Sequence, residues 1–127
     1  MDATAALMDR WHVLVVDDDE TIGSLVAEML AMSGYETTTA RSYQEAIAAA
    51  GGQRIDLVIS DIVLGVGAGD GLDVVEGVLA LQPCAKTLFI SGYAKHGTLT
   101  DDDPLLPKPF DLRQLLDRVE SLLGTGA

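Results

Sequence analysis

Carboxylates stand directly after two apolar runs of this sequence. Residues 12–16 (HVLVV) are followed by Asp17 and Asp18, and residues 55–60 (IDLVIS) are followed by Asp61. Carboxylates that are packed together repel one another unless a cation neutralises them. Mg²⁺ prefers oxygen ligands and typically uses one or two carboxylates together with a phosphate. The acids therefore predict a Mg²⁺ site, which Mn²⁺ could also fill, wherever the fold brings them together.

A hydroxyl and an ammonium group follow later apolar runs in the same way. Ser91 ends the run at residues 86–91, and Lys108 follows the short run at residues 105–106 after one proline. A carboxylate beside a metal ion can attack phosphorus and become an acyl phosphate. The metal, an ammonium and a hydroxyl can then stabilise the charge on the transferred oxygens. The set predicts phosphoryl transfer to Asp61.

Each of these residues also has an ordinary structural explanation when it is taken alone. Asp18 or Asp19 would serve as a helix N-cap, and Asp61 would serve as a turn residue. Ser91 would be a strand-end hydroxyl, and Lys108 would face solvent. Spacing and order, rather than any single residue, favour the phosphoryl-transfer site.

Strand-like runs alternate with amphipathic segments along the chain. Strands are predicted at residues 12–16, 35–40, 55–60, 86–91 and 105–106, and helices at residues 20–33, 42–52, 71–81 and 111–123. This alternation predicts an α/β fold with a doubly wound, five-stranded parallel sheet. With the flavodoxin-like order 2-1-3-4-5, the ends of strands 1, 3, 4 and 5 meet on one rim, where ligands bind in such sheets. Strand 2 is the more polar, so it is expected at the sheet edge.

Local signals set the expected helix ends and faces. Gly34 stands where a C-cap glycine belongs, Ser42 and Glu45 form a capping-box pattern, and Asp111 caps the last helix. The helix at residues 20–33 carries its apolar residues mostly at helical spacing, as follows: Ile22, Leu25, Val26, Met29, Leu30 and Met32. The last helix is expected to place one apolar face inward, as follows: Leu112, Leu115, Leu116, Val119, Leu122 and Leu123.

One interval breaks the alternation of strands and helices. Residues 94–103 (AKHGTLTDDD) contain Gly97 in the middle and one large apolar residue. We therefore expect the fourth helix of the doubly wound fold to be short or missing.

Composition limits the classes of function. The net charge of −12 and the pI of about 4.2 disfavour direct binding to nucleic acid or to an anionic membrane surface. One cysteine, Cys84, excludes an internal disulfide, and no apolar run is long enough to span a membrane. Residues 1–10 lack signal-peptide character and are expected to be an N-terminal extension, and residues 124–127 a frayed C-terminus. These features favour a cytoplasmic protein.

Five segments together resemble the response-regulator receiver (CheY-like) family of two-component signalling. They are VLVVDDDE (13–20), DLVISDIVL (56–64), DGLDVV (70–75), LFISGYA (88–94) and LPKPF (106–110). The resemblance covers residues 11–123, which are identified as one receiver domain.

The resemblance implies a role for each matching residue. Asp61 would accept a phosphoryl group from a histidine kinase or a histidine phosphotransfer protein, and an unknown downstream protein would respond. Asp17 and Asp18 would hold Mg²⁺, with the backbone carbonyl of Val63 completing the protein ligands. Ser91 would be the switch hydroxyl, and Lys108 would contact the phosphoryl group.

The sequence departs from the family pattern around the switch. Leu105 stands where receivers usually carry Tyr or Phe, and the interval between Ser91 and Lys108 is shorter than usual. We therefore predict that output does not use the ordinary face built around the fourth helix. Val63 and Tyr93 flank the site and are poor at positioning water, which predicts slow self-dephosphorylation. The alternative for Tyr93 is that it only packs on its loop.

Two alternative functions, a phosphohydrolase and a docking module, also fit parts of the sequence. Residues 17–21 formally fit the D-x-D-x-T motif of haloacid-dehalogenase-type phosphohydrolases. That family would leave Asp61 unexplained, and 127 residues leave no room for its cap domain. A receiver that is never phosphorylated and serves only as a docking module is the second alternative. The chain is expected to be a stand-alone receiver without an output domain, although a domain excised from a longer protein would give the same pattern.

Overall fold

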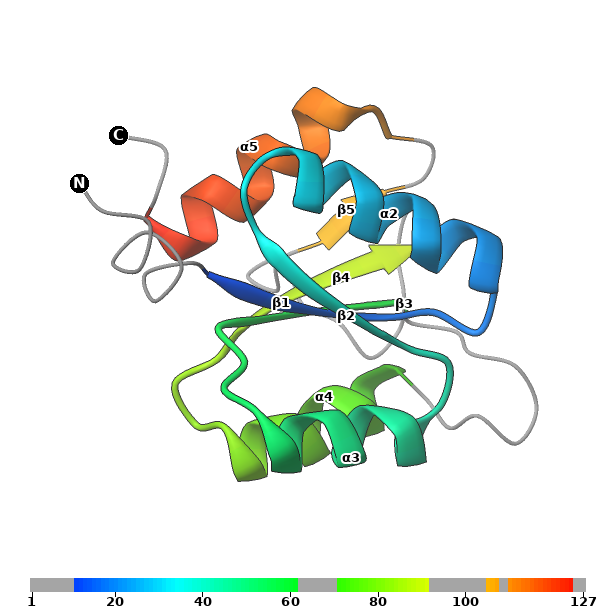
Figure 1. Ribbon diagram of the computed structural model, residues 1–127, viewed down its shortest axis with the longest axis vertical. Coiled ribbons are helices and arrows are strands. Elements are labelled where there is room, and N and C mark those ends of the chain that lie inside the picture. The colour runs from blue at the N-terminus through cyan, green and yellow to red at the C-terminus, as the bar shows by residue number, and fades with distance from the viewer. Residues whose placement is uncertain (1–10, 62–70, 92–104, 108–109, 125–127) are drawn as a thin grey trace.

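The computed structural model describes residues 11–61, 71–91, 105–107 and 110–124. Strands and helices alternate through most of this part of the chain (Figure 1). The elements are β1 (His12–Val16), α2 (Glu20–Met32), β2 (Glu36–Ala40), α3 (Tyr43–Gly52), β3 (Leu57–Asp61), α4 (Gly71–Leu81), β4 (Lys86–Ser91), β5 (Leu105–Pro107) and α5 (Leu112–Leu123).

The strands form one sheet in the order β2-β1-β3-β4-β5, and every pair of neighbours is parallel. This order confirms the predicted 2-1-3-4-5 sheet, with the polar strand β2 at one edge. Helices α2 and α5 cover one face, and α3 and α4 cover the other (Figure 1). Because the strands are all parallel, their carboxyl ends lie along the same rim of the sheet.

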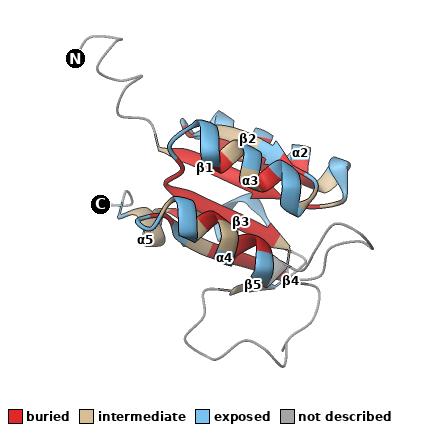
Figure 2. Ribbon diagram, turned by 90° about the horizontal axis from the view of Figure 1, so that it is seen from below, coloured by how far each residue is buried: buried red, intermediate tan, exposed pale blue. Residues whose placement is uncertain are grey.

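The central strands are buried on both faces, as their unbroken apolar runs predict (Figure 2). Val13 and Val15 of β1 point into the core beneath α2 and α5, where they meet Leu30 and Leu115. Alternate residues of the same strands point to the opposite side, where they pack against α3 and α4; this second core includes Leu14, Val16, Ala46, Ala50, Val58, Val74, Val78 and Phe89. Two cores on opposite sides hold the sheet, and with it the rim, in place.

The predicted helix ends are largely present. Gly34 has a φ of 98°, and the N–H groups of Gly34 and Tyr35 donate to the carbonyls of Ala31 and Leu30, which closes α2 with a Schellman motif. The Ser42 hydroxyl accepts from the N–H of Glu45 at 3.2 Å, so Ser42 caps α3 as predicted.

The predicted capping box of α3 is only half formed. The Glu45 carboxylate accepts from the N–H of Arg41 rather than from that of Ser42. Asp111 caps α5 in a complete box with Gln114, for which the D-x-x-Q spacing was a usable signal.

Some apolar residues of the predicted helices are exposed rather than buried. Leu25 and Met32 of α2 are 50% and 82% exposed, and Leu112 of α5 is 38% exposed, so its expected inward position was wrong. Ile22 and Met29, on the other flank of α2, pack against the core. Apolar spacing in α2 thus covers a wider arc than the sheet can bury.

Two further expectations concerned the fourth helix and membrane-spanning segments. The interval 94–103, where a short or missing helix was expected, lies outside the described residues. No helix in the described part of the chain has both the length and the apolar character required to cross a membrane.

Candidate functional site

Three carboxylates meet at the carboxyl ends of β1 and β3. Asp17 follows β1 directly, and Asp61 is the last residue of β3, where it pairs with Ile90 of β4. Strand β3 therefore begins and ends later than the predicted 55–60. One oxygen each from Asp17, Asp18 and Asp61 lies within 4.8 Å of the others.

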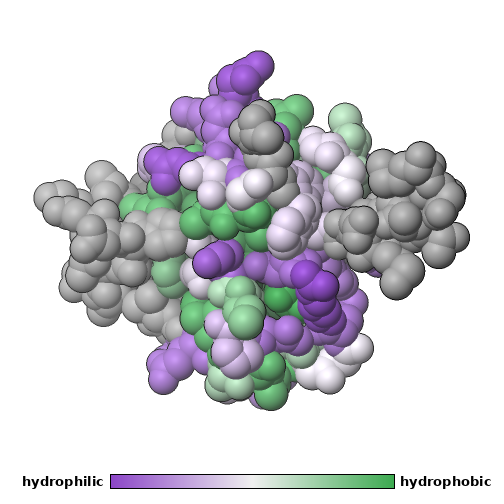
Figure 3. Space-filling view, turned by 90° about the vertical axis from the view of Figure 1, so that its left-hand side faces the viewer, coloured by the Kyte–Doolittle hydropathy of each residue, from purple (hydrophilic) through white to green (hydrophobic). Residues whose placement is uncertain are grey.

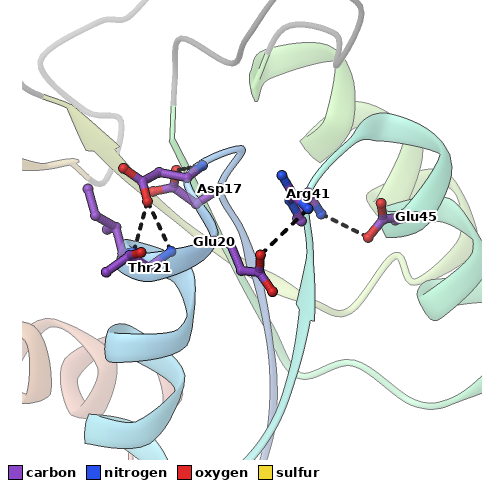
Figure 4. Close-up of polar contacts among 7 residues, drawn as sticks. Asp17, Glu20, Thr21, Arg41 and Glu45 are labelled. Carbon is purple, nitrogen blue, oxygen red and sulfur yellow. Dashed lines mark hydrogen bonds and ion pairs between the residues drawn. The ribbon is translucent and has the colours of Figure 1, made fainter.

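Backbone contacts fix the acid at the end of β1. Asp17 is only 5% exposed, and its N–H donates to the carbonyl of Ala40 at 3.0 Å. Its Oδ1 accepts from the N–H of Asp19 at 2.8 Å. Asp19 in turn caps α2, since its Oδ1 accepts from the N–H groups of Thr21 and Ile22 at 3.0 and 3.3 Å (Figure 4). Asp19 is therefore the helix cap, while Asp17 and Asp18 face Asp61.

The chemistry of this cluster suits a hard divalent cation. All three candidate ligands are carboxylates, which are the ligands that Mg²⁺ and Mn²⁺ favour over softer metals. Three negative charges this close repel one another, and a bound cation would relieve that repulsion. Asp17, Asp18 and Asp61 would be the side chains that hold it.

An ion pair beside the cluster was missed by sequence reasoning. The Arg41 guanidinium lies 3.7 Å from the Glu20 carboxylate (Nη1 to Oε2), and the backbone N–H of Arg41 donates to Glu45 Oε1 at 3.2 Å (Figure 4). The sequence held a usable signal, because β2 ends at Ala40 and its next residue must lie on the same rim as Asp17 and Asp61.

The remaining predicted residues are described only in part. The backbone of Ser91 ends β4 opposite Pro107. Leu105 is half-buried, packs against the core of α3 and α4, and accepts a hydrogen bond at its carbonyl from Arg118 Nη1 at 2.9 Å. Val63, Tyr93 and Lys108 lie outside the described residues.

Comparison with known proteins decides the family. The model of the response regulator receiver domain matches residues 13–120 of this chain. The chain belongs to the response-regulator receiver family. A sheet in the family's strand order, with acids gathered at its carboxyl rim, is the architecture on which that match falls.

Individual relatives support the same assignment. The chain is 33% identical over 118 residues to the probable transcriptional regulatory protein TcrX of Mycobacterium tuberculosis, covering 87% of this chain and 49% of TcrX. The chain thus spans about half the length of this curated relative. The receiver domain of the hybrid histidine kinase CckA is 32% identical with a TM-score of 0.76, over 88% of this chain and 98% of that one.

A third relative carries information about ligands. It is a response regulator from Burkholderia pseudomallei, solved with a phosphorylated aspartic acid, a calcium ion and citrate. It is 28% identical with a TM-score of 0.77, and the match covers 90% of this chain and 69% of that one. Receiver domains are signalling phosphoacceptors that bind Mg²⁺ in an acidic pocket and are phosphorylated by histidine kinases or phosphotransfer proteins. The haloacid-dehalogenase alternative finds no support in these comparisons.

Proposed function

We propose that this receiver domain accepts a phosphoryl group on Asp61 from a histidine kinase or a histidine phosphotransfer protein, in a Mg²⁺-dependent reaction. The observation that carries the proposal is the convergence of Asp17, Asp18 and Asp61 within 4.8 Å at the carboxyl rim. The phosphorylated aspartate and the calcium ion of the Burkholderia regulator support the same chemistry here.

The transfer would be a displacement at phosphorus. An oxygen of the Asp61 carboxylate forms a bond to phosphorus, and the bond from phosphorus to the donor's imidazole nitrogen breaks. The electron pair stays on that nitrogen, which takes up a proton. Mg²⁺, when bound by Asp17, Asp18, Asp61 and the Val63 carbonyl, supplies positive charge that offsets the negative charge of the phosphoryl oxygens.

The domain's own polar groups would complete the site. In this proposal Lys108 contacts the phosphoryl group through its ammonium, and the Ser91 hydroxyl donates to one phosphoryl oxygen. The short contact between Asp19 and Asp17 orients Asp17 before any ligand arrives, which lowers the entropy lost on cation binding.

The output of the domain is proposed to be unusual. Leu105 replaces the usual aromatic residue and is already half-buried against the core. It has no ring to swing with the Ser91 hydroxyl, so we propose that the signal does not pass through the ordinary fourth-helix face. A structure of the phosphorylated protein with an ordered fourth helix and the usual family dimer would contradict this.

The remaining assignments are part of the same proposal. We assign the receiver domain to residues 11–123, preceded by an N-terminal extension at 1–10, in a cytoplasmic protein in which this domain binds neither nucleic acid nor membrane directly. An immunoblot of cell fractions tests the localisation, since a cytoplasmic protein would be found in the cytosolic fraction. Phosphotransfer profiling against the histidine kinases of the same cell would identify the donor.

Acetyl phosphate with Mg²⁺ provides the direct test of the acceptor. Intact mass spectrometry should show one added phosphoryl group in the wild type and in Asp117→Asn, an exposed acid of α5. Asp61→Asn and removal of the cation with a chelator should each abolish it. Phosphorylation that survives in Asp61→Asn would refute the assignment, and hydrolysis of phosphomonoesters would favour the phosphohydrolase. A protein that responds neither to Mg²⁺ nor to acetyl phosphate would be a docking module.

A further inference from the structure

The Glu20–Arg41 ion pair joins two elements beside the carboxylate cluster. Glu20 is the first residue of α2, two positions after Asp18, and Arg41 follows β2 at the same rim. The carbonyl of the preceding residue, Ala40, accepts from the N–H of Asp17 at 3.0 Å. Figure 4 shows Glu20 between Asp17 and Arg41. The pair thus lies at the same rim as the cluster.

The Glu20–Arg41 ion pair contributes little to the stability of the fold. The side chains of Arg41 and Glu20 are 57% and 74% exposed, and exposed pairs of this kind contribute little to folding. The backbone of Arg41 is held independently, because its N–H donates to Glu45 and the neighbouring Ser42 caps α3. The backbone from which the Arg41 side chain extends therefore stays at the rim whether or not the ion pair forms.

We propose that Glu20 raises and Arg41 lowers the affinity of the carboxylate site for its divalent cation, so that the ion pair balances the two effects. Glu20 is a further carboxylate next to the cluster, in addition to the capping Asp19, and alone it would strengthen the negative field that attracts the cation. Arg41 carries one positive charge at the same rim and offsets that field. Arg41 therefore holds the affinity below the value that the cluster and Glu20 would give without it. This inference rests on the proposed function, because it concerns the same cation site.

The expected effects have opposite signs for the two partners. Arg41→Gln removes a positive charge and should tighten Mn²⁺ binding, whereas Glu20→Gln removes a negative charge and should weaken it. One exposed unit charge within a Debye length of a divalent ion changes its affinity by roughly two- to fourfold at low salt. The double variant should return close to the wild-type affinity.

Matched controls exist elsewhere in the chain. Arg54 pairs with Asp56 at 2.8 Å. Asp56 lies at the opposite rim, where its backbone binds the first residues of β1 and β4, His12 and Lys86. Figure 3 views the side of the molecule at which the strands begin, where hydrophilic and apolar surface alternate. Arg54→Gln therefore removes the same charge far from the site, and Glu28→Gln removes an exposed acid farther along α2.

The test is a titration of the purified chain with Mn²⁺, in which the free ion is followed by electron paramagnetic resonance. It is run at about 0.1 M ionic strength, where the Debye length is roughly 10 Å and distant charges are screened, and repeated at about 1 M, where it falls to roughly 3 Å. We expect a two- to fourfold shift in opposite directions for Arg41→Gln and Glu20→Gln, no shift for the two controls, and a much smaller shift at high salt. Circular dichroism checks that every variant is folded.

The possible outcomes distinguish failure of this inference from failure of the proposed function. If the wild type binds Mn²⁺, Asp18→Asn loses it, and both pair variants bind as the wild type does, the inference is wrong and the proposed function stands. If the wild type binds no Mn²⁺, both fail. Equal shifts in Arg54→Gln and Arg41→Gln would mean that only net charge matters, which would also overturn the inference.

Discussion

The backbone N–H of Asp19 donates a hydrogen bond to Oδ1 of Asp17 at 2.8 Å. The side chain of the same Asp19 accepts from the first N–H groups of α2. One residue thus joins the start of a helix to an acid of the cation site. Asp17 is almost fully buried, so contacts within the protein, this one among them, hold its orientation. Substitutions at Asp19 should therefore distinguish its role as the N-cap of α2 from the effect of its negative charge.

Replacing the cap tests that separation. Asp19→Ala should lower the free energy of unfolding by about 1 kcal/mol, because the N–H groups of Thr21 and Ile22 lose their acceptor. Asp19→Asn removes the same charge but keeps a good capping oxygen, so it should remain close to the wild type. Urea denaturation measures both. Equal destabilisation by Asn and Ala would show that charge, not capping, is what Asp19 provides.

Neutralising one acid of the cluster should affect stability in two opposite ways. Without divalent cation, Asp18→Asn should unfold at a higher temperature than the wild type, because repulsion among the three carboxylates is relieved. With Mg²⁺ at one hundred times its Kd, the wild type should gain about 2.7 kcal/mol and overtake the variant.

Thermal unfolding with and without Mg²⁺ measures this reversal. Asp117→Asn, an exposed acid on α5, is the control and should keep the full response to Mg²⁺. A stabilisation by Mg²⁺ that persists unchanged in Asp18→Asn would remove Asp18 from the ligand set.

The central strands and the acids at their ends were predictable for one shared reason. A strand buried on both faces must be largely apolar, so β1, β3 and β4 are visible as short runs rich in Val, Leu and Ile. In a parallel sheet the residues after such runs must meet at one rim, which places Asp17 near Asp61.

Arg41 was overlooked although the same rule applies to it. Strand β2 is the polar edge strand, and its end was not counted among the ends that could carry function. The residue that follows Ala40 nevertheless reaches the same rim. Its pairing with Glu20 occurs because the start of α2 lies near the end of β2. The spacing of residues along the chain does not show that these two ends are close.

Side-chain burial on helices was harder to predict than strand order. Leu25 and Met32 share one flank of α2 and are seven residues apart, a helical spacing that does not say which flank meets the sheet. The choice between Asp18 and Asp19 as the cap of α2 also required the structure. It depends on which residue takes the extended conformation, and Asp19 does so with a ψ of 105°.

The lifetime of the phosphoryl group tests two residues that lie outside the described part of the chain, Val63 and Tyr93. Neither side chain positions an attacking water well, so the sequence predicts slow self-dephosphorylation. Val63→Asn and Tyr93→Glu should each shorten the lifetime of phosphorylated Asp61, followed as loss of the phosphoryl mass after acetyl phosphate is removed. If both lifetimes match that of the wild type, shielding by these side chains is refuted.

The close packing of α3 on α4 depends on Gly77. A Cβ at this position would lie 2.7 Å from Ile47 Cδ1 and 3.1 Å from the Tyr43 ring. In an open helix, Gly→Ala stabilises by about 1 kcal/mol. Overpacking typically costs about 1–3 kcal/mol. We therefore expect Gly77→Ala to be destabilising by about 1 kcal/mol in the wild-type background.

A second substitution identifies the clash responsible. Ile47→Val removes Cδ1, the atom nearest to the added Cβ, and alone should cost about 1 kcal/mol. In that background Gly77→Ala should become neutral or stabilising, because the gain in helix propensity remains while the worst overlap is gone. Urea denaturation of the four proteins gives the coupling between the two positions. Purely additive effects would show that the contact between Ile47 and the added methyl group is not what makes Gly77 necessary.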